Sequence, residues 1–275
     1  MSITAADVNK LRKQTGAGMM DCKNALTEAN GDFELAIENL RKKGQKIAAK
    51  RSDRDAAEGL VLAKATEDGK RAVLIVVNCE TDFVAKNEGF GEFANTILDA
   101  AVANNPASME ELKALSFTGS DLNIGDKITE EIGKIGEKLD LSAYESVSAE
   151  NVTAYNHPGN KLASIVGFNA VVTADTAKDV AMQVAAMAPV AVTSDAIPAD
   201  LIEKEREIGK ELAIQEGKPA EMADKIAEGR VKKWFKEATL LHQPFIKDNK
   251  MSIDQYLKSQ NSDLTVTEFK RIQLG

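Results

Sequence analysis

The chain has 275 residues, of which 43% are hydrophobic and 28% charged, a balance typical of a water-soluble globular protein with about two domains. No run approaches the roughly 20 apolar residues that cross a bilayer, and the first residues lack the apolar segment of a secretion signal, so we expect a cytoplasmic protein. The net charge of −8 is uneven, because residues 1–55 carry 11 Lys and Arg against 8 Asp and Glu. That segment is therefore +3 and the remainder −11.

The first 55 residues predict a small bundle of three short helices. Thr4 and Asp7, three residues apart, form the capping box that opens the first helix. Asp21 is the expected cap of the second helix, and a glycine turn separates that helix from the third. We expect a charged linker rich in small residues to follow and to end near Asp55.

Basic residues gather between Arg41 and Arg54, and their charge leaves two interpretations open. One is a head that binds RNA or an acidic protein surface. The other is a solvated helix end followed by the linker, and charge alone favours this second interpretation. Because the rest of the chain is acidic and would repel nucleic acid, we do not expect a nucleic-acid partner.

Residues 56–140 have the pattern of a strand hairpin followed by a helix. Two apolar runs flank the hairpin signal Asp68-Gly69, and Phe90 and Phe93 then begin a helical repeat. The same order of strand, turn, strand and helix returns in residues 141–275. We therefore predict an α+β protein with two related halves, each a small antiparallel sheet covered by helices on one face.

The second half carries an insert at about residues 198–236. Its apolar residues Leu201, Ile208 and Leu212 recur at helical spacing, and the pattern breaks just before Pro219. Proline is tolerated only in the first turn of a helix, so the insert should be two antiparallel helices. The narrow apolar stripe is typical of a coiled-coil hairpin that projects from the body.

Catalytic machinery is not recognisable in the sequence. His157 and His242 have no companion at metal-ligand spacing, and no phosphate-binding glycine loop follows a strand. Cys22 and Cys79 lack CxxC spacing and should be reduced thiols. Cys79 as a nucleophile is the remaining enzyme hypothesis, but no base stands at a recognisable spacing. We therefore expect no enzyme activity, no cofactor and no metal.

One aromatic residue stands where the chain should be polar. The apolar run from Ala72 to Val77 predicts a buried strand, and the segment NCETDFVAKNE that follows should be a solvated loop. Phe83 lies in the middle of that loop. From the residues alone, the simplest expectation is that Phe83 folds back beneath the helix that starts near Phe90; the alternative is that it is displayed for a partner.

Four stretches, in order along the chain, resemble the bacterial elongation factor Ts family. They are LRKQTGAGMMDCKNAL, VNCETDFVAKN, EGKPAEMADKIAEGRVKKW and QPFI. Members of that family are nucleotide exchange factors for the translational GTPase elongation factor Tu. The resemblance implies a ubiquitin-associated-like (UBA-like) bundle in residues 1–55, core subdomains in residues 56–140 and 141–275, and an inserted coiled-coil hairpin.

The resemblance also implies which residues contact the partner. Thr81, Asp82, Phe83 and Val84 match the segment that carries exchange in the family. There, the Asp-Phe pair enters a crevice between helices of the GTPase domain, and the whole segment disturbs the bound magnesium ion.

Further contacts are implied at positions that match other motifs of the family, namely Met19, Met20, Lys23, Ile135, Gly136 and His157. For the two methionines, burial in the core of the small bundle is the alternative.

The expected partner is elongation factor Tu, in its GDP-bound and nucleotide-free forms. The chain itself should bind neither nucleotide nor membrane. Its oligomeric state stays open, with a homodimer and a two-to-two complex both compatible with the sequence.

Overall fold

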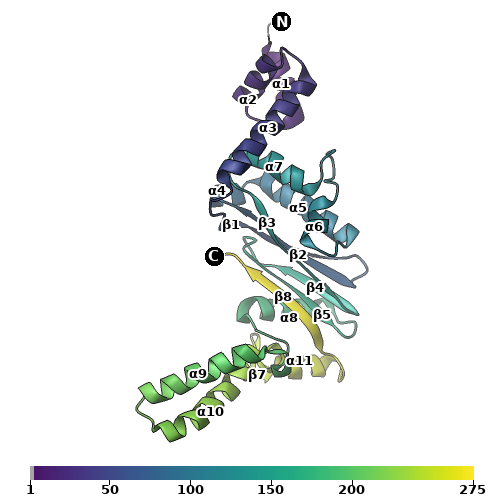
Figure 1. Cartoon of the computed structure of the whole chain (residues 1–275). Helices are drawn as coiled ribbons and strands as arrows, with labels where there is room; N and C mark the ends of the chain where they lie inside the picture. Colours follow the sequence, from purple (N-terminus) through teal and green to yellow (C-terminus); the bar gives the residue numbers. More distant parts are fainter. Residues whose placement is uncertain (1–2) are drawn as a thin grey trace. The chain divides into compact units, whose positions relative to one another are not determined.

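The computed structural model describes residues 3–275, apart from the side chain of residue 220, and the chain forms two compact units (Figure 1). The first unit comprises Met1–Leu62, Ile75–Tyr144 and Gln273–Gly275, and the second comprises Ala63–Leu74 and Glu145–Ile272. Helices are combined with small sheets of two or three strands, with antiparallel pairing where it is resolved, which agrees with the predicted α+β class. Among the helices of residues 3–275, none is long and apolar enough to cross a membrane.

Three helices open the first unit: α1 (Ala5–Thr15), α2 (Met19–Glu28) and α3 (Phe33–Arg51). The predicted capping box of Thr4 and Asp7 is present. The predicted cap at Asp21 is wrong, because α2 already begins at Met19. Asp21 instead accepts a hydrogen bond from Lys43 Nζ at 2.5 Å, so its carboxylate joins α2 to α3.

The third helix continues through the segment that the sequence assigned to a linker. α3 runs without interruption to Arg51, with Gly44 buried at its centre. A Cβ atom added at Gly133, in α7 (Ile124–Ile135), would lie 2.7 Å from the Cα atom of Gly44. The two helices therefore pack backbone against backbone, and this contact explains why a charged segment of low apolar content stays helical.

A three-stranded sheet of order β1-β2-β3 follows, built from β1 (Glu58–Ala65), β2 (Arg71–Cys79) and β3 (Asp140–Ser148). The predicted hairpin between the first two strands is confirmed, with Gly69 in the turn at φ 66°. The third strand has a mixed burial pattern and was not predicted. Helices α5 (Glu88–Asn104) and α6 (Met109–Ala114) belong to the first unit together with α7.

The second unit repeats the order of hairpin and helix, as predicted. Strands β4 (Asn151–Asn156) and β5 (Leu162–Phe168) pair antiparallel, and α8 (Ala174–Met187) follows them. An unpredicted strand, β8 (Val266–Gln273), joins β5 on its other side.

Shorter elements connect the longer ones in this unit. They are two 3-10 turns (Ser194–Ala196 and Leu240–His242), β6 (Pro244–Phe245), β7 (Asp248–Ser252) and α11 (Ile253–Gln260).

The predicted insert is a helical hairpin of α9 (Ala199–Gln215) and α10 (Ala220–Ala238). The predicted apolar stripe is wrong at Ile208 and Leu212, which are each 40% exposed. Small residues form the contact instead: Gly209, Ala213, Ala223 and Ala227 are buried, and a Cβ atom at Gly209 would lie 3.3 Å from Ala227 Cα. Small side chains let the helix backbones approach closely, whereas larger ones would hold them apart.

Candidate functional site

The segment after β2 is one turn of helix, α4 (Asp82–Ala85), where the sequence predicted a loop. Thr81 is the N-cap, and its hydroxyl accepts a hydrogen bond from the Val84 N–H at 3.4 Å. The Thr81 carbonyl accepts from the Ala85 N–H at 3.2 Å. Threonine is a good N-cap because its side-chain oxygen satisfies an N–H that the helix leaves unpaired.

Phe83 projects from this turn into solvent and is 83% exposed. The expectation from the residues alone, that Phe83 folds beneath the helix starting near Phe90, is wrong. The buried aromatic residue there is Phe90 itself, which is only 2% exposed. The Phe90 ring lies 6.4 Å from the Phe93 ring inside the first unit. A phenylalanine this exposed leaves a large apolar area in water, so a partner that buried it would gain free energy.

The charged residue beside Phe83 is paired along the same turn. Asp82 accepts a hydrogen bond from Lys86 Nζ at 2.7 Å, and this bond raises the pKa of Lys86. The Lys86 side chain is 76% exposed, so the pair is a weak surface interaction that a partner can replace. The turn therefore presents an aromatic ring and a carboxylate side by side.

Two carboxylates fix the start of the turn. Glu137 accepts from the Thr81 N–H at 3.1 Å and from the Thr81 hydroxyl at 2.7 Å. Glu80 accepts from the Lys138 N–H at 2.6 Å and from Arg51 Nη1 at 2.7 Å. The Lys138 hydrogen bond, and after it the Arg51 guanidinium, lowers the pKa of Glu80 despite an opposing effect of burial.

Cys79 lies directly beneath the turn and is fully buried. Its Sγ atom donates a hydrogen bond to the Thr81 carbonyl at 3.1 Å. Burial, and then the charge of Glu137, raises the pKa of Cys79 to about 11. The thiol is therefore neutral near pH 7, which argues against the hypothesis of a cysteine nucleophile, since thiolates are the reactive form. Cys22 is also a buried free thiol.

Met19 and Met20 open α2 and are 53% and 62% exposed, so neither is a core residue of the bundle. With Lys23 they line a shallow pocket whose other wall comes from the start of α1. Methionine side chains are flexible and polarisable, which suits a surface that adapts to a partner.

Ile135 is the last residue of α7, and Gly136 caps the helix at φ 78°. The Gly136 N–H donates to the Ile132 carbonyl at 2.8 Å, and the chain then turns to Glu137. The left-handed conformation at Gly136 favours glycine because it carries no Cβ atom. The structure thus brings the predicted contact at residues 135–136 next to the Thr81 turn.

His157 follows β4 and is exposed in the second unit. Its Nδ1 atom lies 3.0 Å from the hydroxyl of Tyr155, which orients the imidazole. Among the described residues, no group of His, Cys, Asp and Glu is arranged to hold a metal ion.

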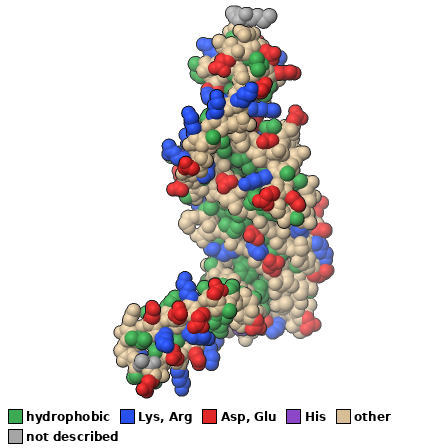
Figure 2. All heavy atoms as spheres, viewed as in Figure 1, with side chains coloured by type: hydrophobic (Ala, Val, Ile, Leu, Met, Phe, Trp, Pro, Cys, Tyr) green, Lys and Arg blue, Asp and Glu red, His purple; other side chains and the backbone are tan. Residues whose placement is uncertain are grey.

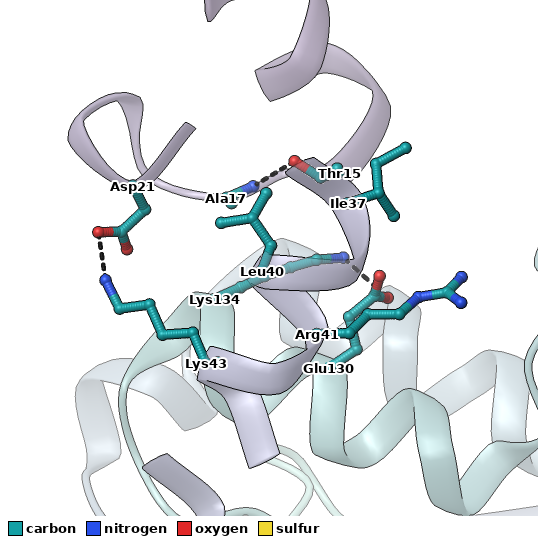
Figure 3. Close-up of a pocket in the computed structure, with 10 residues that line it drawn as sticks. Thr15, Ala17, Asp21, Ile37, Leu40, Arg41, Lys43, Glu130 and Lys134 are labelled. Atoms are coloured by element: carbon teal, nitrogen blue, oxygen red, sulfur yellow. Dashed lines mark hydrogen bonds and ion pairs between the residues drawn. The ribbon is translucent and has the colours of Figure 1, made fainter. Parts of the chain in front are cut away.

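A pocket of the first unit lies where α2, α3 and α7 meet, and Figure 3 shows that charged side chains fill its edge. Lys134 reaches Glu131 at 2.8 Å and Glu130 at 3.3 Å. Burial opposes the ionisation of Glu130, but Lys127 and Lys134 outweigh it and lower the pKa of that carboxyl. These lysines and glutamates neutralise one another where the helices meet.

Lys and Arg side chains gather over the N-terminal helices, of which α3 is one (Figure 2). Lys42 pairs with Glu38 at 2.7 Å, Lys43 with Asp21 at 2.5 Å, and Arg51 with Glu80 at 2.7 Å. These pairs offset part of the charge, so the structure adds no support to the RNA hypothesis.

Sequence reasoning identified Phe83 but missed Glu80 and Glu137, the two carboxylates that hold its turn. Glu137 follows the predicted contact at Ile135 and Gly136 directly, and this adjacency was the one available signal. The hydrogen bond itself joins residues 56 positions apart, which periodicity cannot reveal.

Comparison with known proteins agrees with the resemblance noted in the sequence. The family model described as "Elongation factor TS" matches residues 80–275. The chain is 51% identical over 278 residues to a protein of Amoebophilus asiaticus named elongation factor Ts, with all of both chains covered. It is 50% identical to the protein of that name from Porphyromonas gingivalis, covering 100% of this chain and 99% of the relative. A relative from Chlorobaculum parvum with the same name is 43% identical, with 99% of each chain covered.

Proposed function

This chain belongs to the elongation factor Ts family, and from that premise we propose that it is the guanine-nucleotide exchange factor for elongation factor Tu. In this proposal it binds the GDP-bound GTPase in the cytoplasm and promotes GDP release during translation elongation. It acts by binding alone, without covalent chemistry or a cofactor, and it does not itself bind the nucleotide.

The observation that carries the mechanism is the exposure of Phe83. We infer that Asp82 and Phe83 enter a crevice between helices of the GTPase domain, and that the segment Thr81 to Val84 disturbs the magnesium ion. Full burial of a phenylalanine contributes about 1.5 to 3 kcal/mol, which is roughly tenfold to a hundredfold in affinity. If the crevice exists only in the open GTPase, this free energy favours the open form.

Reciprocity then explains how binding alone can release GDP. Whatever factor the bound nucleotide imposes on the affinity for this chain, the chain must impose on the affinity for the nucleotide. The chain therefore speeds exchange in both directions, and the concentrations of GTP and GDP decide the net result.

Additional contacts are proposed for the residues that match other motifs of the family. The exposed Met19 and Met20, with Lys23, supply a soft apolar surface with one positive charge. Ile135 and Gly136 extend the surface beside the Phe83 turn, and His157 supplies a contact from the second unit. The UBA-like character of the first bundle and the coiled-coil character of the hairpin belong to the same proposal.

The stoichiometry of the complex can be determined by measuring its mass in solution. A homodimer has twice the mass of the single chain, and a two-to-two complex has twice the mass of a one-to-one complex. Light scattering of the chain alone therefore tests the first, and light scattering with elongation factor Tu tests the second.

The decisive experiment measures release of fluorescent GDP from elongation factor Tu by wild type and by Phe83→Ala. We expect the variant to accelerate release about ten- to hundredfold less at subsaturating concentration, since the apolar burial is lost. Its thermal stability should match wild type, because the side chain is 83% exposed in the free chain.

The matched control is Val171→Ala, which also removes an apolar side chain that is 75% exposed. We expect this control to release GDP at the wild-type rate. Equal rates for Phe83→Ala and wild type would refute the proposed mechanism.

A further inference from the structure

The Phe83 turn is too short to be stable on its own. α4 has four residues, and isolated helices much shorter than about 12 residues do not persist in water. None of its four side chains is fully buried, and Val84 and Ala85 are only half-buried, so apolar packing holds it weakly. Polar contacts at its start therefore contribute much of its order.

The polar contacts meet at Thr81. Its hydroxyl oxygen must accept the hydrogen bond from the Val84 N–H, and this requires the hydroxyl hydrogen to point elsewhere. Glu137 Oε1, at 2.7 Å, accepts that hydrogen, while Glu137 Oε2 takes the Thr81 N–H at 3.1 Å. The carboxylate thus fixes both the rotation of the hydroxyl and the position of the backbone.

We propose that Glu137 is a positioning residue that orders the turn from Thr81 to Lys86, and with it Phe83, before the partner arrives. It touches neither the nucleotide nor, in this proposal, the partner. Its effect passes through the N-cap of the turn. This inference rests on the proposed function for its consequence in nucleotide exchange, but the ordering of the turn can be measured in the free chain.

The position of Glu137 is itself well fixed. Gly136 ends α7 with φ 78°, which turns the chain so that residue 137 faces Thr81. The next residue, Lys138, donates its N–H to Glu80 at 2.6 Å, and its Nζ atom donates to the carbonyls of Ser52 and Arg54 at 2.8 and 2.9 Å. Two consecutive residues on each side are therefore joined, residues 80–81 to residues 137–138.

Preorganisation gives this arrangement a functional consequence. Ordering a backbone residue costs about 1 to 2 kcal/mol, and a turn that is already ordered does not lose this free energy on binding. A disordered turn could still display Phe83, but part of the gain from burying the ring would be spent on ordering the backbone. Loss of Glu137 should therefore weaken exchange without removing any contact with the partner.

The test is Glu137→Gln in the full chain. Glutamine has nearly the same shape, but one of its two terminal groups is an NH2 that only donates, so its two terminal atoms cannot each accept one hydrogen of Thr81 as the two oxygens of Glu137 do. The matched control is Glu111→Gln, since Glu111 Oε2 accepts a backbone N–H from Ala107 at 2.7 Å in the first unit, away from the turn in sequence.

The first readout is amide hydrogen exchange of Ala85, Lys86 and Asn87, whose N–H groups bond to carbonyls of the turn. We expect exchange at these amides to become about five- to tenfold faster in Glu137→Gln, as for the net loss of one typical hydrogen bond. The control should leave them unchanged. Unchanged amide exchange in Glu137→Gln would overturn the proposal.

The second readout is release of fluorescent GDP from elongation factor Tu. We expect Glu137→Gln to be about five- to tenfold less active than wild type, and to have almost no further effect when Phe83 is already alanine. Faster amide exchange with full activity, or an equal loss in both backgrounds, would contradict a positioning role. If Phe83→Ala alone had no effect, the proposed function would fail, while the amide measurement would still decide whether Glu137 orders the turn.

Discussion

Two phenylalanines seven positions apart, Phe83 and Phe90, have opposite environments in this protein. Phe90 is the side chain at helical spacing with the rest of α5, and it is 2% exposed. Phe83 stands on a turn whose N-cap is tied to Glu137, and it is 83% exposed. From residue type alone, both rings would be expected in the core. The backbone of the turn is held by the bond from Thr81 to Glu137, and this keeps the Phe83 ring in water.

The pKa of Cys79 predicts how the stability of the protein changes with pH. Its folded pKa is about 11, raised chiefly by burial from a usual value of 9.0. Below pH 9 the thiol is protonated in both folded and unfolded chains, so it has no effect on stability there. Between pH 9 and 11 only the unfolded chain ionises, and the free energy of unfolding must fall as pH rises.

We expect this loss to reach up to about 2 to 3 kcal/mol near pH 11, from the shift in the pKa of Cys79. Urea unfolding in the presence of reductant, at several pH values from 8 to 11, measures it. Cys79→Ala should have a shallower alkaline decline than wild type. Parallel slopes for Cys79→Ala and wild type would show that the thiol does not ionise as described.

At the scale of elements, the close contact of α3 with α7 depends on glycine. Gly44 meets the Thr129 carbonyl, with an added Cβ atom only 3.3 Å from that oxygen, and Gly133 meets the Gly44 backbone. Each glycine lowers helix propensity by about 1 kcal/mol relative to alanine. The packing of the two backbones compensates for this loss and lets α3 continue to Arg51.

Alanine at position 133 tests this contact. Gly133→Ala would place a Cβ atom 2.7 Å from Gly44 Cα, so the helices must separate, and we expect a loss of about 1 to 3 kcal/mol in the free energy of unfolding. Gly91→Ala is the matched control, because Gly91 lies in α5 with no atom within 4 Å of its added Cβ. That control should be stabilised by about 0.5 to 1 kcal/mol. Chemical denaturation measures both changes, and stabilisation by Gly133→Ala would refute the close packing.

The helical hairpin shows the same rule in a different pair of helices. Gly209 and Ala227 lie in contact while the larger Ile208, Leu212 and Met222 stay 40%, 40% and 52% exposed. The sequence pattern predicts large apolar residues at the contact between the two helices. Helical spacing shows which residues share one face of a helix, but it does not show which face lies against the other helix. Packing of small residues decided the outcome.

At the scale of the whole molecule, the chain enters each compact unit more than once. Residues 63–74 belong with the second unit, although they lie between segments of the first. The predicted ranges of 1–55, 56–140 and 141–275 stay a prediction about how the chain folds. Their first boundary can be tested, because α3 lies on α7 within the first unit.

A chain that begins at residue 56 would lack α3. It would therefore lose the packing of α3 on α7 and the hydrogen bond from Arg51 to Glu80. If about 2 kcal/mol is lost, the midpoint of thermal unfolding of the remaining protein should fall by about 4 to 8 °C. A chain that begins at residue 32 keeps α3, so its midpoint should stay closer to that of the full chain. Calorimetry measures all three, and an unchanged midpoint for the shorter chain would mean that residues 1–55 fold independently.

The sequence by itself determined the elements whose cause is local. The capping box of Thr4 and Asp7, the hairpin turn at Asp68-Gly69 and the break before Pro219 all lie where the pattern placed them. Each depends on residues within a few positions of one another, and so the physics is readable in the order of the letters. Four motifs then sufficed to indicate the family.

Only the tertiary structure decided which side chains stay in water and what holds them there. The exposure of Phe83, Met19 and Met20 could not be read from residue type, and the strands β3 and β8 had no clear alternation. The bond from Thr81 to Glu137 spans 56 positions. Such a contact forms only when the whole unit folds. Local propensity depends on neighbouring residues, so it cannot predict a hydrogen bond between residues so far apart in the sequence.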